Sequence, residues 1–245
     1  MTQDELKKMV GLAALPFIKP GMKIGLGTGS TVKHLVDGLG RRMKEEGLQV
    51  TCVTTSSITT RQANELGIPL VDLDDVDHLD LTIDGADQVD QNFNGIKGGG
   101  GSMLWEKIVN TASDKNIWIV DESKLVERIG SFGVPVEIVP YGASHVFRRL
   151  EQKGLKPTWR MAKDSDQLYR TDENNVIIDV HPGPIEDVNA LDQELINMVG
   201  VVEHGLFIQR INDIIIGREQ GPETIHVKDW KTWIKSPCWR SDSGF

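Results

Sequence analysis

The sequence predicts an α/β fold: a parallel sheet with helices on both faces, interrupted by a small inserted α+β module. Three observations lead to this prediction. Apolar strand patterns alternate with amphipathic helix patterns over the first half of the chain. From about residue 131 the order becomes strand, helix, strand, strand, helix, strand, which is the ferredoxin-like order. A further apolar run near residue 212 then provides a strand that returns to the first sheet.

The first half alternates between the two kinds of element. Thr2 and Glu5 form a capping-box pattern that begins a helix over 3–18, and Pro20 with Gly21 ends it. Apolar residues at helical spacing predict a second helix over 31–46. Further helices are expected at 59–66 and 102–113, and strands at 22–26, 48–53, 68–73, 79–83 and 116–120.

The second half predicts the inserted module and the return to the sheet. Strands are expected at 134–139, 157–161, 176–180, 201–207 and 212–216, and helices at 143–152 and 191–198. We therefore expect a catalytic domain of residues 1–130 plus 206–225 and a small domain of residues 131–205. Residues 226–245, with Trp230, Trp233 and Trp239, form a C-terminal extension that fits neither domain.

The composition excludes several classes of function. The 245 residues include 27 Lys and Arg against 36 Asp and Glu, a net charge of −9, which argues against nucleic-acid and membrane-surface partners. No stretch approaches 18 consecutive apolar residues, so no membrane span is expected. Cys52 and Cys238 cannot form a disulfide framework, and the polar, acidic N-terminus is unlike a secretory signal. These features favour a cytoplasmic protein.

Four predicted strands are followed by small, hydroxyl or charged residues. Ligands of parallel α/β sheets bind at the carboxyl ends of the strands, so we expect these segments to meet at one site. The segments are GLGTGST at 25–31, TTSS at 54–57, DGAD at 84–87 and DESK at 121–124.

The loop containing Thr28, Gly29, Ser30 and Thr31 lies between a strand and a helix start. Backbone N–H groups, the helix dipole and the hydroxyls there can bind an anion, although a plain tight turn is the alternative. The loop departs from the dinucleotide-binding fingerprint, because Ser30 stands where the last glycine belongs and no acidic residue closes the second strand. Hydroxyls at both strand ends suit a phosphate better than a ribose.

The segment Asp84-Gly85-Ala86-Asp87 places two carboxylates three residues apart after a strand. This pair could move the protons of sugar hydroxyls. The alternatives are an Asp-rich turn or a magnesium site, although Mg²⁺ usually takes more oxygen ligands.

The run Lys97-Gly98-Gly99-Gly100 continues into a fourth glycine and a helix start. Such a run suits close approach of the backbone to a ligand beside one cation, and a flexible linker is the alternative. In that helix Leu104, Ile108 and Ala112 mark the expected buried stripe, and Glu106, about 200° from Leu104, faces away from it. On the residues alone, a surface position is favoured for both Glu106 and Lys124, although the place of Glu106 just after the glycine run supports a functional role.

Taken together in this order, the motifs resemble the ribose-5-phosphate isomerase family of the A type. The opening TQDELKK at 2–8 and the segment VPVEIVP at 134–140 are similar to its bacterial branch. The resemblance extends from residue 1 to about residue 225. It implies a Rossmann-like catalytic domain with an inserted small ferredoxin-like domain at the subunit interface, and a homodimer or homotetramer that uses no metal and no cofactor.

The resemblance also implies an activity and residue roles. It implies interconversion of D-ribose 5-phosphate and D-ribulose 5-phosphate through a cis-enediolate, in the pentose phosphate pathway. Glu106 matches the catalytic base, Lys97 would stabilise charge, Asp84 would assist ring opening, Asp87 would orient hydroxyls and Lys124 would bind substrate. The substrate-binding segments would be 28–31, 84–87 and 97–100. Leu104 and Trp105 depart from the Thr-Arg that the family often has before this Glu-Lys pair.

Two other functions remain open from the residues. A non-catalytic sugar-phosphate sensor would keep the phosphate loop but would not need Asp84, Lys97 and Glu106. A related sugar-phosphate isomerase-deaminase would release ammonia from an amino-sugar phosphate.

Overall fold

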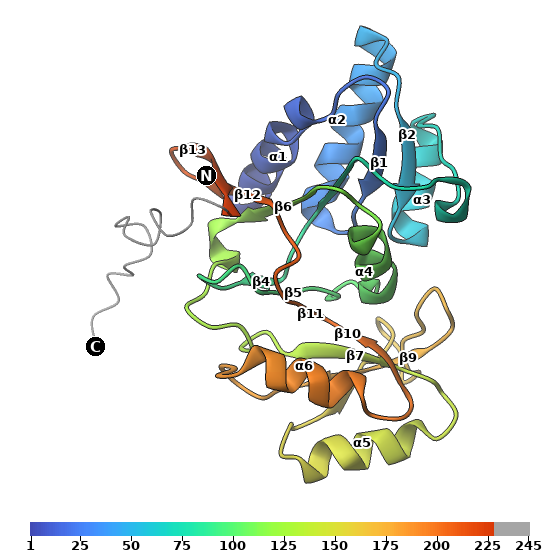
Figure 1. Ribbon diagram of the computed structural model, residues 1–245, viewed down its shortest axis with the longest axis vertical. Helices are drawn as coiled ribbons and strands as arrows, with labels where there is room; N and C mark the ends of the chain where they lie inside the picture. Colours follow the sequence, from blue (N-terminus) through green and yellow to red (C-terminus); the bar gives the residue numbers. More distant parts are fainter. Residues whose placement is uncertain (228–245) are drawn as a thin grey trace.

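The computed structural model describes residues 1–227, and its largest sheet has six strands in the order β13-β12-β6-β3-β1-β2 (Figure 1). Neighbouring strands are parallel except β13, which lies antiparallel along the outer edge of β12. The strands are β1 (Lys23–Leu26), β2 (Thr51–Thr54), β3 (Leu81–Asp84), β6 (Asn116–Asp121), β12 (Asp213–Arg218) and β13 (Gly221–His226).

Helices cover this sheet, and this packing removes the apolar faces of the helices and the sheet from water. Helix α1 (Gln3–Ala13) begins at the Thr2–Glu5 capping box and packs on α2 (Ser30–Glu46), and both bury aliphatic side chains in one cluster with β1, β3 and β6. The other helices beside the sheet are α3 (Ser57–Glu65) and α4 (Met103–Thr111), with short 3-10 helices at Leu15–Phe17, Leu73–Asp75 and Glu122–Lys124. In the described part of the chain, no helix is long and apolar enough to cross a bilayer.

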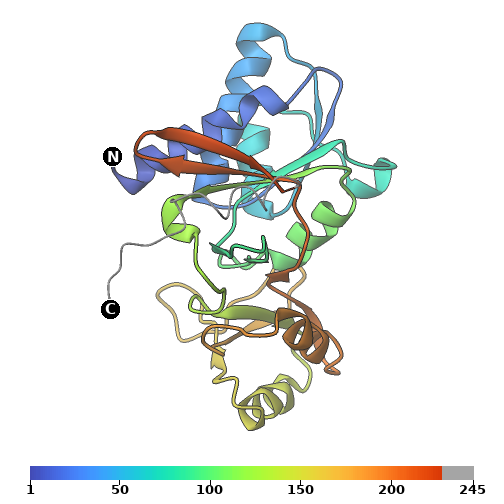
Figure 2. The ribbon, with the colours of Figure 1, turned by 60° about the vertical axis from the view of Figure 1, so that its left-hand side comes forward.

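A second sheet is antiparallel and has the ferredoxin-like order β10-β7-β9-β8. Helices α5 (Ala143–Gln152) and α6 (Val188–Ile196) cover the face that is turned away from the large sheet (Figure 2). The strands are β7 (Val134–Ile138), β8 (Thr158–Trp159), β9 (Val176–Val180) and β10 (Val201–His204). The α/β fold class with a small ferredoxin-like part is therefore confirmed, whereas the boundaries at 131 and 205 stay a prediction.

The chain crosses between the two parts at Gly205. The sequence predicts one strand over 201–207, but the structure divides it into β10 and β11 (Leu206–Phe207). Strand β11 belongs to a third sheet in the order β11-β5-β4, with β5 (Gly95–Ile96) in the middle and β4 (Gln88–Val89) on the other side. Gly205 donates its N–H to Pro135 O and accepts from Lys97 N at 2.9 Å. A Cβ there would lie 2.2 Å from Lys97 O, so only glycine fits this crossing.

Other elements also differ from the sequence prediction. The first helix ends at Ala13 instead of continuing to residue 18, and Pro16 lies in the following 3-10 turn. Residues 68–73 are not a strand: Leu70 forms only an isolated bridge with Cys52, and Pro69 has no N–H to donate. Strand β13 was not predicted, because its alternating exposed residues carry little apolar signal. Of the predicted C-terminal extension, residues 226–245, the part from residue 228 onward lies outside the described residues.

Candidate active site

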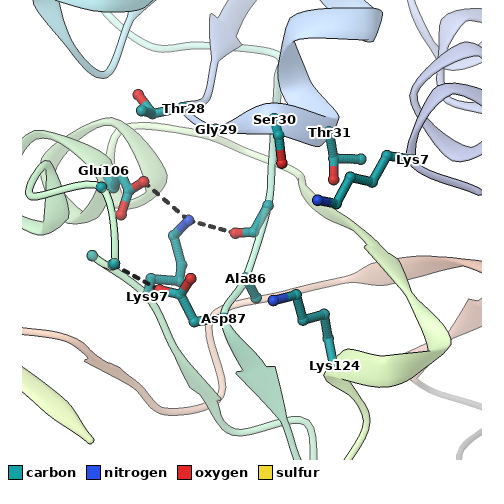
Figure 3. Close-up of a pocket in the computed structure, with 14 residues that line it drawn as sticks. Lys7, Thr28, Gly29, Ser30, Thr31, Ala86, Asp87, Lys97, Glu106 and Lys124 are labelled. Atoms are coloured by element: carbon teal, nitrogen blue, oxygen red, sulfur yellow. Dashed lines mark hydrogen bonds and ion pairs between the residues drawn. The ribbon is translucent and has the colours of Figure 1, made fainter. Parts of the chain in front are cut away.

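A pocket opens where β1 and β3 end, and residues from six separate stretches of the chain meet there (Figure 3). The parallel pairing of β1 with β3 brings the glycine loop after β1 next to the Asp-Gly-Ala-Asp segment after β3. The pocket is lined by Lys7, Thr28, Gly29, Ser30, Thr31, Gly85, Ala86, Asp87, Lys97, Gly98, Gly99, Gly100, Glu106 and Lys124.

One side of the pocket suits an anion. Gly29, at φ 117°, precedes α2 and makes no side-chain cap, so the first turn of the helix presents N–H groups at Ser30 and Thr31. Lys7 from α1 and Lys124 from the turn after β6 lie on this side (Figure 3). The helix dipole and two ammonium groups make the region locally positive within an acidic protein.

The opposite side holds a buried cluster of charges. Lys97 Nζ lies 2.8 Å from Asp84 Oδ2 and 3.5 Å from Glu106 Oε1, and it donates to Gly85 O at 2.5 Å. The Lys97 side chain is only 2% exposed. Burial acts to lower the pKa of Lys97, but the charges of Asp84 and Glu106 outweigh it and raise that pKa. Lys97 therefore carries a positive charge at neutral pH.

Glu106 is the carboxylate of this cluster that lines the pocket. Burial raises its pKa from 4.5 to about 8; the charge of Lys97 opposes the rise, and those of Asp84 and Asp87 add to it. Among the described residues, Glu106 Oε2 has no hydrogen-bond partner. A carboxylate with a pKa near neutrality and one free oxygen is suited to general base catalysis.

Asp84 lies behind Lys97 and does not line the pocket. Its Oδ1 accepts from the N–H groups of Thr28 at 3.0 Å and Gly85 at 2.7 Å, and its Oδ2 faces Lys97. The ring-opening role expected of Asp84 is therefore not favoured, because both oxygens are already engaged. Asp87 does line the pocket and accepts the N–H of Gly99 at 2.7 Å.

The hydroxyl groups near the loop after β1 are engaged with one another. Thr28 lines the pocket, and its hydroxyl pairs with those of Thr55 and Ser56, both at 2.7 Å. The buried hydroxyls after β2 therefore anchor the loop after β1 and do not line the phosphate region. Lys7 was missed: it lies far from the other motifs in sequence, and only the packing of α1 on α2 brings it to the pocket.

The predicted orientation of α4 is wrong. The expected stripe of Leu104, Ile108 and Ala112 is not the buried face, and Ile108 is 47% exposed. The buried residues of α4 are Met103, Glu106, Lys107, Val109 and Asn110. The helix lies between the large sheet and strands β7 and β10, so it buries charged residues that find partners there: Lys107 donates to Glu203 Oε1 and His204 O, both at 2.7 Å.

A divalent cation has no obvious place among these carboxylates, because the Lys97 ammonium group lies between Asp84 and Glu106. A different group, His78, Asp80 and Asp114, has ligand atoms within 4.8 Å of one another. It lies where β3 and β6 begin, at the edge opposite the pocket.

Comparison with known proteins agrees with this geometry. Residues 51–221 match the family model of ribose 5-phosphate isomerase A (phosphoriboisomerase A). This chain belongs to the ribose-5-phosphate isomerase A family. Ribose-5-phosphate isomerase A of Limosilactobacillus reuteri is 57% identical over 229 residues, which cover 93% of this chain and 100% of that protein. The Lactiplantibacillus plantarum protein of the same name is 54% identical over 93% of this chain and 100% of its own length.

Solved structures of the family share the whole described fold. Ribose 5-phosphate isomerase A of Methanocaldococcus jannaschii has a TM-score of 0.87 and 37% identity, covering 92% of this chain and 100% of that chain. A D-ribose-5-phosphate isomerase in complex with phospho-erythronic acid has a TM-score of 0.89 and 35% identity, with the same coverage. The family and fold expected from the sequence motifs are thus confirmed.

Proposed function

We propose that this chain interconverts D-ribose 5-phosphate and D-ribulose 5-phosphate through a cis-enediolate, with Glu106 as the general base. Membership of the family makes it an isomerase of this sugar phosphate. The solved relative bound to phospho-erythronic acid shows a family member holding a phosphorylated sugar acid. For this chain, the observation that carries the proposed mechanism is the buried Lys97–Glu106 pair facing the anion side of one pocket.

One side of the pocket would bind the substrate phosphate, and the other would hold the reacting carbons of the sugar. The substrate phosphate would bind the α2 N-terminus between Lys7 and Lys124, which supply charge-assisted hydrogen bonds. The sugar chain would then extend toward Glu106, past Asp87 and the backbone of Gly98 to Gly100. Because Asp87 lines the pocket, it would contact the sugar hydroxyls and assist ring opening.

Proton transfer would use one carboxylate twice. Glu106 removes the proton from C2 of the open-chain aldose, which leaves a cis-enediolate. The proton of the C2 hydroxyl passes to the C1 oxygen, and Glu106 returns its proton to C1, so that C2 becomes the carbonyl carbon of the ketose. Such a base contributes roughly 10²–10⁴-fold. Lys97 stabilises the negative charge that develops on the enediolate oxygen, and Asp84 keeps Lys97 charged and in place. A non-catalytic sugar-phosphate sensor would not need this buried set of Asp84, Lys97 and Glu106.

We propose further that residues 1–130 plus 206–225 form the catalytic domain and that residues 131–205 mediate a homodimer or homotetramer in the cytoplasm. Val139, Tyr141 and Val199 on the small domain are exposed by 42%, 96% and 81%, and Val139 N donates to Gly200 O, which brings the backbone segments that carry them together. Light scattering coupled to size-exclusion chromatography tests the assembly, and a strict monomer would contradict it.

The deciding experiment is an isomerase assay on ribose 5-phosphate, run with and without a chelator. Wild-type protein should be active in both conditions and Glu106→Gln inactive. Loss of wild-type activity with chelator would contradict the metal-free mechanism. Ammonia release from an amino-sugar phosphate would instead indicate an isomerase-deaminase.

A further inference from the structure

The loop that joins β8 to β9 crosses from the small sheet to the walls of the pocket. We name residues 160–173 the strap. The strap contacts the part of the molecule that holds the pocket at several points. Tyr169 Oη donates to Gly100 O at 3.2 Å, and Asp172 accepts from Ser57 N at 3.1 Å. Glu173 accepts from Trp105 Nε1 at 2.8 Å, so the residue that departs from the family pattern is one of the points to which the strap is tied.

Arg160 makes the contact nearest to the chemistry. Its Nε donates to Asp179 Oδ2 at 2.9 Å and its Nη2 pairs with Asp179 Oδ1, which together form a bidentate fork on β9. Its remaining nitrogen, Nη1, donates to Gly98 O at 2.7 Å and more weakly to Gly99 O at 3.4 Å. The guanidinium group thus joins the small sheet to the carbonyl of Gly98, the residue that follows Lys97.

From here on, the glycine loop means residues 97–101, which lead into α4. Within this loop, Gly101 N donates to Gly98 O at 2.9 Å, the same carbonyl that Arg160 contacts. Gly98 has φ 92° and Gly101 has φ 89°, conformations that only glycine adopts readily. On the side opposite the strap, Asp87 accepts the N–H of Gly99, so the loop is held by its carbonyls on one side and by an amide on the other. A Cβ on Gly101 would lie 2.5 Å from the Tyr169 ring, which shows how closely the strap covers it.

We infer that Arg160, oriented by Asp179, is a positioning residue for the isomerase reaction: it fixes the glycine loop and, through it, the reacting side of the pocket. The inference rests on the proposed roles of Lys97 and Glu106. It gives the inserted small domain a function in catalysis in addition to any function in assembly. Lysine could not replace Arg160, because one ammonium group cannot pair with both oxygens of Asp179 and also reach Gly98 in the plane of the fork.

The test compares Arg160→Ala, Arg160→Lys and Asp179→Asn with Asp172→Ala, a matched control that removes a strap contact away from the glycine loop. Small misplacements of a reacting centre cost up to about 10²-fold. We expect kcat/KM for ribose 5-phosphate to fall by about tenfold to a hundredfold in the first three variants, with kcat reduced and Arg160→Lys no better than Arg160→Ala. The inhibition constant of inorganic phosphate should stay unchanged, because the anion side does not contact Arg160. Asp172→Ala should keep wild-type kcat.

Two further readouts separate positioning from general destabilisation. Guanidinium at millimolar concentration should partly restore kcat of Arg160→Ala without raising its Tm. The inference is overturned if kcat and KM are unchanged in Arg160→Ala, if phosphate inhibition weakens in parallel, or if Asp172→Ala loses as much activity. Glu106→Gln assayed alongside keeps the two questions apart: an active Glu106→Gln refutes the proposed base, whereas an inactive Glu106→Gln with a fully active Arg160→Ala refutes only this inference.

Discussion

The ammonium group of Lys97 lies 3.5 Å from the carboxylate of Glu106, and the two side chains are 2% and 6% exposed. A base and a charge-stabilising cation are thereby held together in a region that excludes water, where electrostatic interactions are strong. Asp84 completes the cluster from behind, so the net charge of the three groups depends on whether Glu106 carries a proton.

Replacing Glu106 by glutamine should abolish turnover without unfolding the protein. The amide side chain would keep the size of the original but could not accept a proton, so kcat should fall by roughly 10²–10⁴-fold. The measurements are the isomerase rate and thermal unfolding, with Glu45→Gln on the exposed face of α2 as the control. Turnover near the wild-type value would refute the role of Glu106.

The pH dependence of kcat/KM should report the raised pKa of Glu106. The base must be ionised to act, and its pKa in the free enzyme is about 8, so kcat/KM should rise with pH and level off above that value. The phosphate of the substrate has its second pKa at about 6, so any effect of its ionisation on kcat/KM would appear as a separate change near pH 6. A profile that stays flat around pH 8 contradicts the assignment.

The same group makes stability depend on pH. The folded pKa of Glu106, about 8, lies above its ordinary 4.5, so the folded state binds this proton more tightly. Its contribution to stability is therefore complete below pH 4.5 and lost as pH rises through about 8. Relative to Glu106→Gln, the wild-type free energy of unfolding should decrease across that window in denaturant titrations; a difference that does not vary with pH would disagree with a buried carboxyl group of raised pKa.

Lys7 should matter for binding more than for turnover. It contacts the proposed phosphate position and not the reacting carbons, so Lys7→Ala should raise KM with little change in kcat. Hydrogen bonds to charged groups contribute about 1.5–3 kcal/mol, which corresponds to about tenfold or more in KM. Lys8→Ala, the exposed neighbour that does not line the pocket, is the control. Equal effects of the two changes would show that only general charge is involved.

Gly27 and Gly100 should respond differently to alanine. A Cβ on Gly27 would lie 2.0 Å from Asp84 Oδ1 and 2.6 Å from Asp84 Cα, whereas one on Gly100 would meet only Thr28 Cγ2 at 3.8 Å. Gly27→Ala should therefore lower the free energy of unfolding by about 1–3 kcal/mol or more and disturb Lys97 through Asp84. Gly100→Ala should unfold at the wild-type denaturant concentration. Equal stabilities would show that β1 and β3 can separate at no cost.

Local patterns in the sequence were enough to predict most elements and the loops that meet at the pocket, whereas the roles of Glu106 and Lys124 came from the family resemblance. The capping box at Thr2, the alternation of elements and the order of strands after residue 131 depend on neighbouring residues, and they led to the correct fold class. The rule that ligands bind where parallel strands end brought 28–31, 84–87 and Lys124 to one edge. The misassigned segments are those where a partner distant in sequence decides the conformation, such as the break at Gly205 and the stretch at 68–73, which forms only an isolated bridge with Cys52.

The sequence by itself determined which chemical groups are present and on which strand ends they lie, because secondary structure and strand order follow from periodicity and turn residues. Only the tertiary structure decided their electrical state and their neighbours. Helix α4 is packed on several sides, so Glu106 is buried and not surface-exposed, and its pKa rises. The packing of α1 on α2 brings Lys7 to the pocket, and the strap brings Arg160 to the glycine loop. Desolvation and long-range contacts depend on packing in three dimensions, which local sequence patterns do not encode.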